Sequence, residues 1–395
     1  MIRPLVLTLA TFALAACARP SRVEVIAKPA ASSAANCGFL QPYLDSVHAA
    51  GRFPGATLGV AFPDGSSCAI ATGWSDTAKR VRMEPTHLLL AGSVGKTYFG
   101  ALAMQLAAEG ALDLDAPVSR YLGHEPWFFR LPNAREITVR QLMNHTSGIV
   151  RYELQPRFLA ALRANPDTTW TAETRLAFLL DSLAPFRAGT GFYYSDSNYI
   201  VLGLILERIM GRDAYREIGR RITGPLGLAR TVPSDRRVIS GLAQGYAGAN
   251  NPFINADAMI LPDGRFAVNP QFEWAGGGFA TSAEDLARWT KHLYEGRAYP
   301  DTLLRQVIDG VDASSQLGRG VRYGLTTIIR ASPLGVTYGH SGFMPGYVTD
   351  TRYWPEHRVA VALQVNTSAP GVIGRPPGEI LTTVVRRALE RSGKE

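Results

Sequence analysis

The stretch that decides the fold of this chain reads Ala91-Gly92-Ser93-Val94-Gly95-Lys96-Thr97. It contains the only Ser-x-x-Lys of the 395-residue sequence, in which five of the 41 basic residues are lysines. Apolar residues recur at helical spacing between positions 94 and 108, so we expect a helix to start here. Residues three apart lie on one face of a helix, which places Lys96 directly beneath Ser93.

Three chemistries compete for this stretch. As a phosphate-binding loop it would match the end of G-x-x-x-x-G-K-[ST], but Leu90 occupies the first glycine position. As the nucleophile elbow of an α/β-hydrolase it differs from G-x-S-x-G at one position, too few residues precede it, and Lys96 has no role. In the third interpretation Ser93 is a nucleophile, and a desolvated Lys96 of lowered pKa helps to activate it. Only this third interpretation gives a chemical role to both Ser93 and Lys96.

Two later segments supply the partners that such a nucleophile needs. Tyr194-Ser195-Asp196 lies on a loop before an apolar, helix-like run. His340-Ser341-Gly342 lies at the end of a predicted strand, where a glycine lets a substrate approach the backbone closely. The order of the three segments along the chain is therefore nucleophile, proton-handling loop and edge strand.

Together these segments resemble the class C β-lactamase and D-alanyl-D-alanine carboxypeptidase family of serine hydrolases, with its esterase and D-aminopeptidase relatives. The similarity runs from about residue 40 to 390 and includes Leu142-Met-Asn-His-Thr-Ser-Gly148, Gly224-Pro-Leu-Gly-Leu228 and Gly276-Gly-Gly-Phe279. It implies an acyl-enzyme mechanism without metal or cofactor. The residues it implies are Ser93, Lys96, Tyr194 and His340 as catalytic groups, the backbone N–H groups of Ser93 and Phe343 as oxyanion donors, and Asp196, Ser341, Gly342 and Asn366 as substrate contacts.

One position departs from the family pattern. Asp196 stands where the Tyr-x-Asn element of the family has an asparagine that contacts the substrate's amide. An ionised carboxylate accepts hydrogen bonds but cannot donate them, so we expect an ester or an unusual amide as substrate. Asp196 is also expected to be the N-cap of the following helix. A rival alignment with the Ser-Asp-Asn element of class A enzymes, through Ser195-Asp196-Ser197, lacks its asparagine as well.

Strand patterns occur at both ends of the chain and helical patterns in its middle. Residues 56–73 predict two strands joined by a turn. Further strands are expected over 336–340, 347–353 and 359–365, before a closing helix over 379–391. We therefore expect an α/β (α+β) fold with an antiparallel sheet flanked by helices and built from both chain ends. Its boundaries are 37–115 and 276–395 for the discontinuous α/β domain and 116–275 for an all-helical middle subdomain.

The first residues predict export. A short apolar run ends at Leu14-Ala15-Ala16-Cys17, which resembles a bacterial lipobox. We expect 1–16 to be a signal peptide, Cys17 to be lipidated and 17–36 to be a tether; the alternative is an ordinary secretory signal. The expected location is the periplasmic side of a membrane, the outer one by preference. Cys37 and Cys68 then lie where disulfides persist and are expected to be bridged, with two buried thiols as the alternative.

The composition of the chain limits the binding partners that we expect. The formal charge is +8, but no basic run is present, so we expect no nucleic acid. Neither the spacing of the cysteines nor nearby histidines suggests a metal site. We expect a monomer whose membrane contact is the lipid anchor. The substrate is a small molecule or a peptidoglycan peptide with an ester, peptide or β-lactam carbonyl. Two other functions stay open: an α/β-hydrolase-type esterase, and a non-catalytic penicillin-binding sensor.

Overall fold

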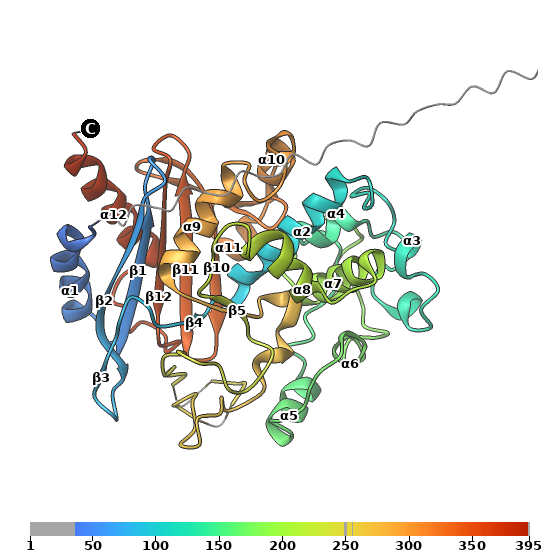
Figure 1. The fold of residues 1–395 in the computed structure, drawn as a ribbon. Coiled ribbons are helices and arrows are strands. Elements are labelled where there is room, and N and C mark those ends of the chain that lie inside the picture. Colours follow the sequence, from blue (N-terminus) through green and yellow to red (C-terminus); the bar gives the residue numbers. More distant parts are fainter. Residues whose placement is uncertain (1–35, 249–250, 255, 394–395) are drawn as a thin grey trace, which may run out of the picture.

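The computed structural model describes residues 36–248, 251–254 and 256–393. Its main feature is a nine-stranded antiparallel sheet in the order β3-β2-β1-β12-β11-β10-β9-β8-β7 (Figure 1). The expected signal peptide and the lipidation site Cys17 lie outside the described residues. The strands are β1 (Gly55–Ala61), β2 (Ser67–Asp76), β3 (Val81–Arg82), β7 (Val311–Asp312), β8 (Arg322–Tyr323), β9 (Ile328–Ser332), β10 (Gly335–Met344), β11 (Tyr347–Trp354) and β12 (Val359–Val365).

The two ends of the chain meet in the middle of this sheet. Strand β1 pairs with β12 from Ala56 to Ala61, with Leu58 opposite Leu363. Every residue of β1 and β12 is buried, as expected for central strands that are covered on both faces. The expected antiparallel sheet built from both chain ends is therefore confirmed.

Helices cover both faces of the sheet. On one face lie α1 (Gln41–Ala50) and α12 (Pro377–Arg391), and on the other lies α9 (Ala283–Tyr294), which packs against β1, β11 and β12 (Figure 1). The apolar side chains of α1 and α12 form one core cluster with the central strands. The larger core lies on the α9 side and continues into the helical part of the molecule.

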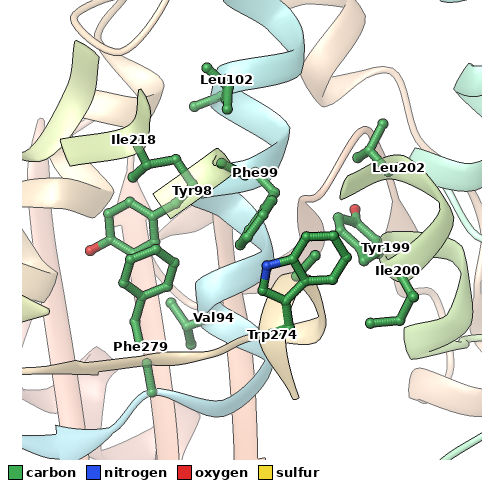
Figure 2. Close-up of a cluster of buried hydrophobic side chains, with 14 of the residues drawn as sticks. Val94, Tyr98, Phe99, Leu102, Tyr199, Ile200, Leu202, Ile218, Trp274 and Phe279 are labelled. Carbon is green, nitrogen blue, oxygen red and sulfur yellow. The ribbon is translucent and has the colours of Figure 1, made fainter. Parts of the chain in front are cut away.

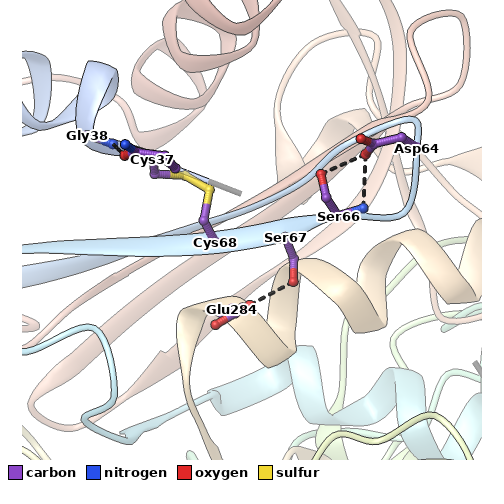
Figure 3. The surroundings of a disulfide bond; sticks show 8 residues. Cys37, Gly38, Asp64, Ser66, Ser67, Cys68 and Glu284 are labelled. Carbon is purple, nitrogen blue, oxygen red and sulfur yellow. Dashed lines mark hydrogen bonds between the residues drawn. A yellow bond between two sulfur atoms is a disulfide. The ribbon is translucent and has the colours of Figure 1, made fainter. Parts of the chain in front are cut away.

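A disulfide joins the first helical segment to the sheet. Cys37 precedes α1, and Cys68 lies in β2; their Cα atoms are 5.8 Å apart (Figure 3). In the same region Ser67 Oγ donates a hydrogen bond to Glu284 of α9, on the other face of the sheet. The expected pairing of the two cysteines is thus present in the structure.

The middle of the chain is helical at first and irregular later. From residue 224 to 269 it has no helix among the described residues and contributes β5 (Thr231–Pro233), which joins β4 (Leu89–Leu90) and β6 (Phe279–Thr281) in a small sheet. The expectation of an all-helical segment therefore holds only for its first part. Besides α1, α9 and α12, the α-helices of the described residues are α2 (Lys96–Ala108), α3 (Ser119–Leu122), α4 (Val139–Met143), α5 (Pro156–Ala164), α6 (Ala172–Leu176), α7 (Asp196–Met210), α8 (Ala214–Ile218), α10 (Leu304–Ile308) and α11 (Ser314–Leu317).

Helix α2 is buried on all sides, and this fixes the position of its first turn. Tyr98 stacks on Trp289 of α9 with 4.3 Å between ring centroids, and Phe99 lies edge-on to Trp274 (Figure 2). Tyr199 and Leu202 of α7 contribute to the same core. No helix in the described part of the chain is long and apolar enough to cross a membrane.

Candidate active site

Ser93 lies in a tight turn that leads into α2. Residues Gly92–Gly95 form a single 3₁₀ turn, and α2 begins at Lys96. A Cβ atom at Gly95 would lie 2.3 Å from the carbonyl oxygen of Gly277, so a glycine is required for the two segments to meet. Lys96 Nζ donates a hydrogen bond of 2.8 Å to Ser93 Oγ. The expected contact between nucleophile and lysine is present.

The Lys96 ammonium group is fully buried and has three acceptors. Besides Ser93 Oγ, it donates to the carbonyl oxygen of Gly276 at 2.5 Å and forms an ion pair with Asp196 Oδ1 at 2.6 Å. Burial lowers the pKa of Lys96, but the Asp196 carboxylate raises it, and the net shift of the pKa is upward. Three acceptors match the three hydrogens of an ammonium group. Lys96 is therefore a cation in the resting site.

Asp196 does not have the capping role that its sequence position predicted. It is the first residue of α7, and the N-cap is Ser195, which makes no side-chain cap hydrogen bond. The Asp196 carboxylate pairs with Lys96 instead. The expectation that Asp196 is the N-cap is wrong, because the buried ammonium is the stronger partner for the carboxylate.

Tyr194 lies over the same ammonium group. Its ring centroid is 5.0 Å from Lys96 Nζ, and its buried hydroxyl has no hydrogen-bond partner among the described residues. Burial raises the pKa of Tyr194, and the Lys96 charge only partly offsets this rise. The hydroxyl is therefore protonated at neutral pH, and it is free to bond to a substrate or to Ser93.

His340 is buried in the wall of the cleft, and both of its ring nitrogens are engaged. Nε2 lies 2.8 Å from the hydroxyl of Tyr323, and Nδ1 lies 2.6 Å from the carbonyl oxygen of Ser341. Burial lowers the pKa of His340 to about 3, so the ring is neutral. These two contacts suit a His340 ring that holds β10 in position. The expected role of His340 in proton transfer stays a prediction.

The end of β10 lies against the turn that carries the nucleophile. A Cβ atom at Gly342 would lie 2.0 Å from the carbonyl oxygen of Ala91 and 3.3 Å from Ser93 N, and one at Gly92 would lie 2.6 Å from Phe343 N. The backbone N–H groups expected to stabilise an oxyanion, those of Ser93 and Phe343, are therefore on adjoining segments. A carbonyl oxygen between them could accept from both.

Asn366 does not belong to the site. Its side chain is fully buried and donates to the carbonyl oxygens of Trp74 and Gln244, at 3.1 and 2.9 Å. It is also absent from the lining of the cleft. The expectation that Asn366 contacts the substrate is wrong, because its amide group ties two backbone segments together.

The other expected residues meet in one open cleft of about 260 Å³. Lys96 lies beneath its floor. Three charged residues that the sequence analysis missed, Arg151, Glu153 and Glu273, also line it, and no motif surrounds them. The lining residues are Ser93, Arg151, Glu153, Tyr194, Asp196, Phe253, Phe272, Glu273, Leu317, Ile328, His340, Ser341, Gly342, Phe343, Met344 and Pro345.

The two glutamates that line the cleft, Glu153 and Glu273, have raised pKa values. Burial raises the pKa of Glu273 to about 8, and the nearby Asp196 charge adds to the rise. Burial and Asp196 also raise the pKa of Glu153 to about 7, although its partner Arg151 opposes this. Among the described residues, no group of three or more His, Cys, Asp or Glu side chains is arranged to hold a metal ion.

Comparison with known proteins identifies the family. A model of the beta-lactamase family matches residues 40–379, so the chain belongs to this family, and its expected relation to β-lactamases and penicillin-binding proteins is confirmed. It is 24% identical over 297 residues to penicillin-binding protein 4* of Bacillus subtilis (72% of this chain, 62% of the relative). It is 28% identical over 176 residues to the teichoic acid D-alanine hydrolase of Staphylococcus aureus (44% and 40%). The chain thus spans less than two thirds of the length of both relatives.

Solved structures share the fold. A D-stereospecific amidohydrolase from Streptomyces sp. superposes with a TM-score of 0.71 at 26% identity, covering 84% of this chain and 95% of its own. A D-amino acid amidase from Ochrobactrum anthropi SV3 gives 0.76 at 22% identity, covering 90% and 99%. The antiparallel sheet and the family match exclude both the phosphate-loop and the nucleophile-elbow interpretations of the Ser93 segment.

Proposed function

We propose that the protein is a serine hydrolase that acts on ester or amide carbonyls through an acyl-enzyme. The observation that carries this proposal is the contact of 2.8 Å between Lys96 Nζ and Ser93 Oγ in an open cleft. A serine hydroxyl becomes an effective nucleophile when a proton acceptor is within hydrogen-bond reach. Ser93 Oγ attacks the carbonyl carbon, and the oxyanion is bound by the backbone N–H groups of Ser93 and Phe343.

The proton of Ser93 has a defined route in this proposal. An ammonium group has no free lone pair, so Lys96 accepts a proton only as it gives one up. Asp196, 2.6 Å away, is the acceptor. The serine proton moves to Lys96 while a Lys96 proton moves to the Asp196 carboxylate, and charge is conserved. The return of this proton to the leaving group, shared with the Tyr194 hydroxyl, releases the first product. Water then hydrolyses the acyl-enzyme.

The aspartate at position 196 and the names of similar proteins favour simple esters and amides over β-lactams as substrates. Asp196 is committed to Lys96 and, when ionised, cannot donate to a substrate carbonyl. Three similar proteins are named teichoic acid D-alanine hydrolase, D-stereospecific amidohydrolase and D-amino acid amidase. These names support an ester or amide substrate for this chain as well.

The decisive test compares labelling with turnover. The wild-type protein should hydrolyse 4-nitrophenyl esters at a steady rate and become labelled at Ser93 by a fluorophosphonate, and Ser93→Ala should lose both activities. Hydrolysis that survives in Ser93→Ala would refute the mechanism. A fluorescent penicillin distinguishes the alternatives, because a penicillin-binding sensor would give stable labelling and a burst without steady turnover.

We propose further that the protein is an exported lipoprotein anchored through Cys17 on the periplasmic side of a membrane. The proposal rests on the lipobox-like Leu14-Ala15-Ala16-Cys17. A disulfide between Cys37 and Cys68 suits an oxidising compartment. Metabolic labelling with a palmitate analogue should tag the wild type and fail to tag Cys17→Ser. If both chains partition equally into the aqueous phase of a detergent extract, the anchor is disproved.

A further inference from the structure

The charges that line the cleft leave one carboxylate without a partner. Lys96 is paired with Asp196, and Arg151 Nε donates to Glu153 Oε1 at 2.6 Å. Glu273 is 95% buried, yet no cation of the described residues pairs with it and no donor reaches its carboxylate. Burying a carboxylate without a partner is costly. Glu273 therefore holds a proton in the empty cleft at neutral pH, and a cation bound beside it would favour its ionised form.

The second glutamate beside the cleft, Glu153, also has an oxygen atom without a hydrogen-bond partner among the described residues. Glu153 is only 3% exposed and lines the cleft, and its Oε2 atom is buried with no hydrogen-bond partner among the described residues. Arg151 occupies only the other oxygen, Oε1. A buried acceptor without a donor indicates a group that is absent when the cleft is empty.

The surroundings of Glu273 hold it beside the nucleophile turn. The carbonyl oxygen of Phe272, the preceding residue, accepts hydrogen bonds from Tyr152 Oη at 2.6 Å and from Arg175 Nε at 2.7 Å. A Cβ atom at Gly277 would lie 2.6 Å from Glu273 Oε1 and 2.4 Å from the carbonyl oxygen of Gly92, next to Ser93. The backbone that carries Glu273 is thus held beside the nucleophile turn.

We propose, building on the proposed acyl-transfer function, that Glu153 and Glu273 form a subsite for a protonated amino group of the substrate. The substrate class is an ester or amide of an amino acid with a free amino group. A bound ammonium group favours the ionised form of both glutamates and supplies N–H donors for their carboxylates. The aromatic rings of Phe253 and Phe343, 6.2 Å apart in the same cleft, provide an apolar surface for the side chain.

The test compares three kinds of 4-nitroanilide that differ in the amino group. They are leucine 4-nitroanilide, in its D and L forms, N-acetyl-leucine 4-nitroanilide, and 4-methylpentanoyl 4-nitroanilide, which has no amino group. We expect kcat/KM for one free-amine form to exceed that of the two neutral compounds by about 10- to 100-fold, the range for a charge-paired hydrogen bond. In Glu273→Gln and Glu153→Gln this ratio should fall towards about one. The matched control Glu379→Gln, on the exposed side of α12, should keep the wild-type ratio.

The two proposals fail in different ways. If 4-nitrophenyl acetate is hydrolysed and Ser93 is labelled, but free-amine and neutral anilides react equally, the ammonium subsite is disproved and the hydrolase stands. If no ester is hydrolysed, the subsite is still testable by calorimetry with the Ser93→Ala protein. Leucine amide should then bind at least about tenfold more tightly than N-acetyl-leucine amide, and equal binding would overturn the proposal. Thermal unfolding checks that each variant is folded.

Discussion

At the scale of single residues, the exchange of an amide for an acid at position 196 changes the state of the catalytic lysine. A buried lysine without a counter-ion has a lowered pKa and can be neutral. Here Asp196 lies 2.6 Å from Lys96 Nζ and keeps it charged. In the proposed mechanism the base is therefore the pair of residues, because Lys96 gains a lone pair only when Asp196 takes a proton.

Replacing Asp196 should make catalysis depend on alkaline pH. In Asp196→Asn the carboxylate is gone, burial is the largest remaining influence on Lys96, and the pKa of Lys96 falls. Activity then requires a neutral lysine, so we expect kcat/KM at pH 6 to fall at least about tenfold and to recover as the pH rises. The pH–rate profile with a 4-nitrophenyl ester measures this. Lys96→Arg is the control, and should be inactive at every pH because arginine keeps its proton. If the activity of Asp196→Asn fell no more steeply towards low pH than that of the wild type, the proposed proton route would be contradicted.

Glu273 should lower the stability of the protein as the pH rises. Its pKa is about 8 in the folded chain against an ordinary value of 4.5, with Asp196 and Glu153 opposing its ionisation and Lys96 favouring it. Between these two values the folded state holds a proton that the unfolded state has lost. Stability therefore falls with increasing pH, at up to about 1.4 kcal/mol per pH unit.

Glu273→Gln should remove much of this dependence and gain stability over the wild type at pH 8. Urea unfolding at pH 5, 6.5 and 8 measures the difference. Parallel curves for the two proteins would show that Glu273 is ionised in the folded state.

At the scale of elements, the site depends on how closely β10 approaches the turn before α2. Gly342 lies where any side chain would collide with the Ala91 carbonyl oxygen. This contact brings the Ser93 and Phe343 amides together, so it determines the geometry of the oxyanion site.

Gly342→Ala should therefore damage catalysis more than stability. Its Cβ atom would lie 2.0 Å from the Ala91 carbonyl oxygen, which forces the strand and the turn apart. A displacement of about 1 Å costs roughly 100-fold in rate, and overpacking costs about 1–3 kcal/mol. The rate of Ser93 labelling and the free energy of unfolding measure the two effects. Gly219→Ala is the control, because a Cβ atom there meets nothing within 4 Å. Equal labelling rates for both variants would contradict this role of Gly342.

The sequence predicts the long elements well because their patterns are local. The strands expected over 336–340, 347–353 and 359–365 correspond to β10, β11 and β12. The short edge strands β7 and β8 were not expected, since two residues carry no period and only pairing with a neighbour makes them strands.

The site is predictable to the extent that it is built from spaced motifs. Ser93 and Lys96 follow from helical spacing. Glu273 does not, because hydrogen bonds to Phe272 from distant residues place it. Asn366 was misassigned for a similar reason: nothing in its own segment reveals that Trp74 and Gln244 occupy its amide.

At the scale of the whole molecule, the disulfide reinforces the edge of the sheet farthest from the cleft. Cys68 lies in β2, and three strands, β1, β12 and β11, separate β2 from β10. Stability and catalysis should therefore be separable at this position.

Removal of the disulfide should weaken the fold and spare the chemistry. The bridge closes a segment with a sequence separation of 31 residues, for which chain entropy gives about 4 kcal/mol of stabilisation. The double variant Cys37→Ser with Cys68→Ser should lose about this much free energy of unfolding and keep its initial rate of ester hydrolysis at 25 °C. Denaturant unfolding with and without a reductant measures the effect. A loss of turnover in the folded variant would show that the two regions are coupled.

The pairing of β1 with β12 also has a consequence for how the chain is made. Synthesis produces β1 and the Ser93 turn before β10, β11 and β12, because the helical part of the chain lies between them. Until those strands are made, β1 lacks its partner β12 and the Ser93 turn lacks the β10 backbone beside it, and long-range pairing of this kind is slow to form. We therefore expect a chain that stops before β10 to have no hydrolase activity.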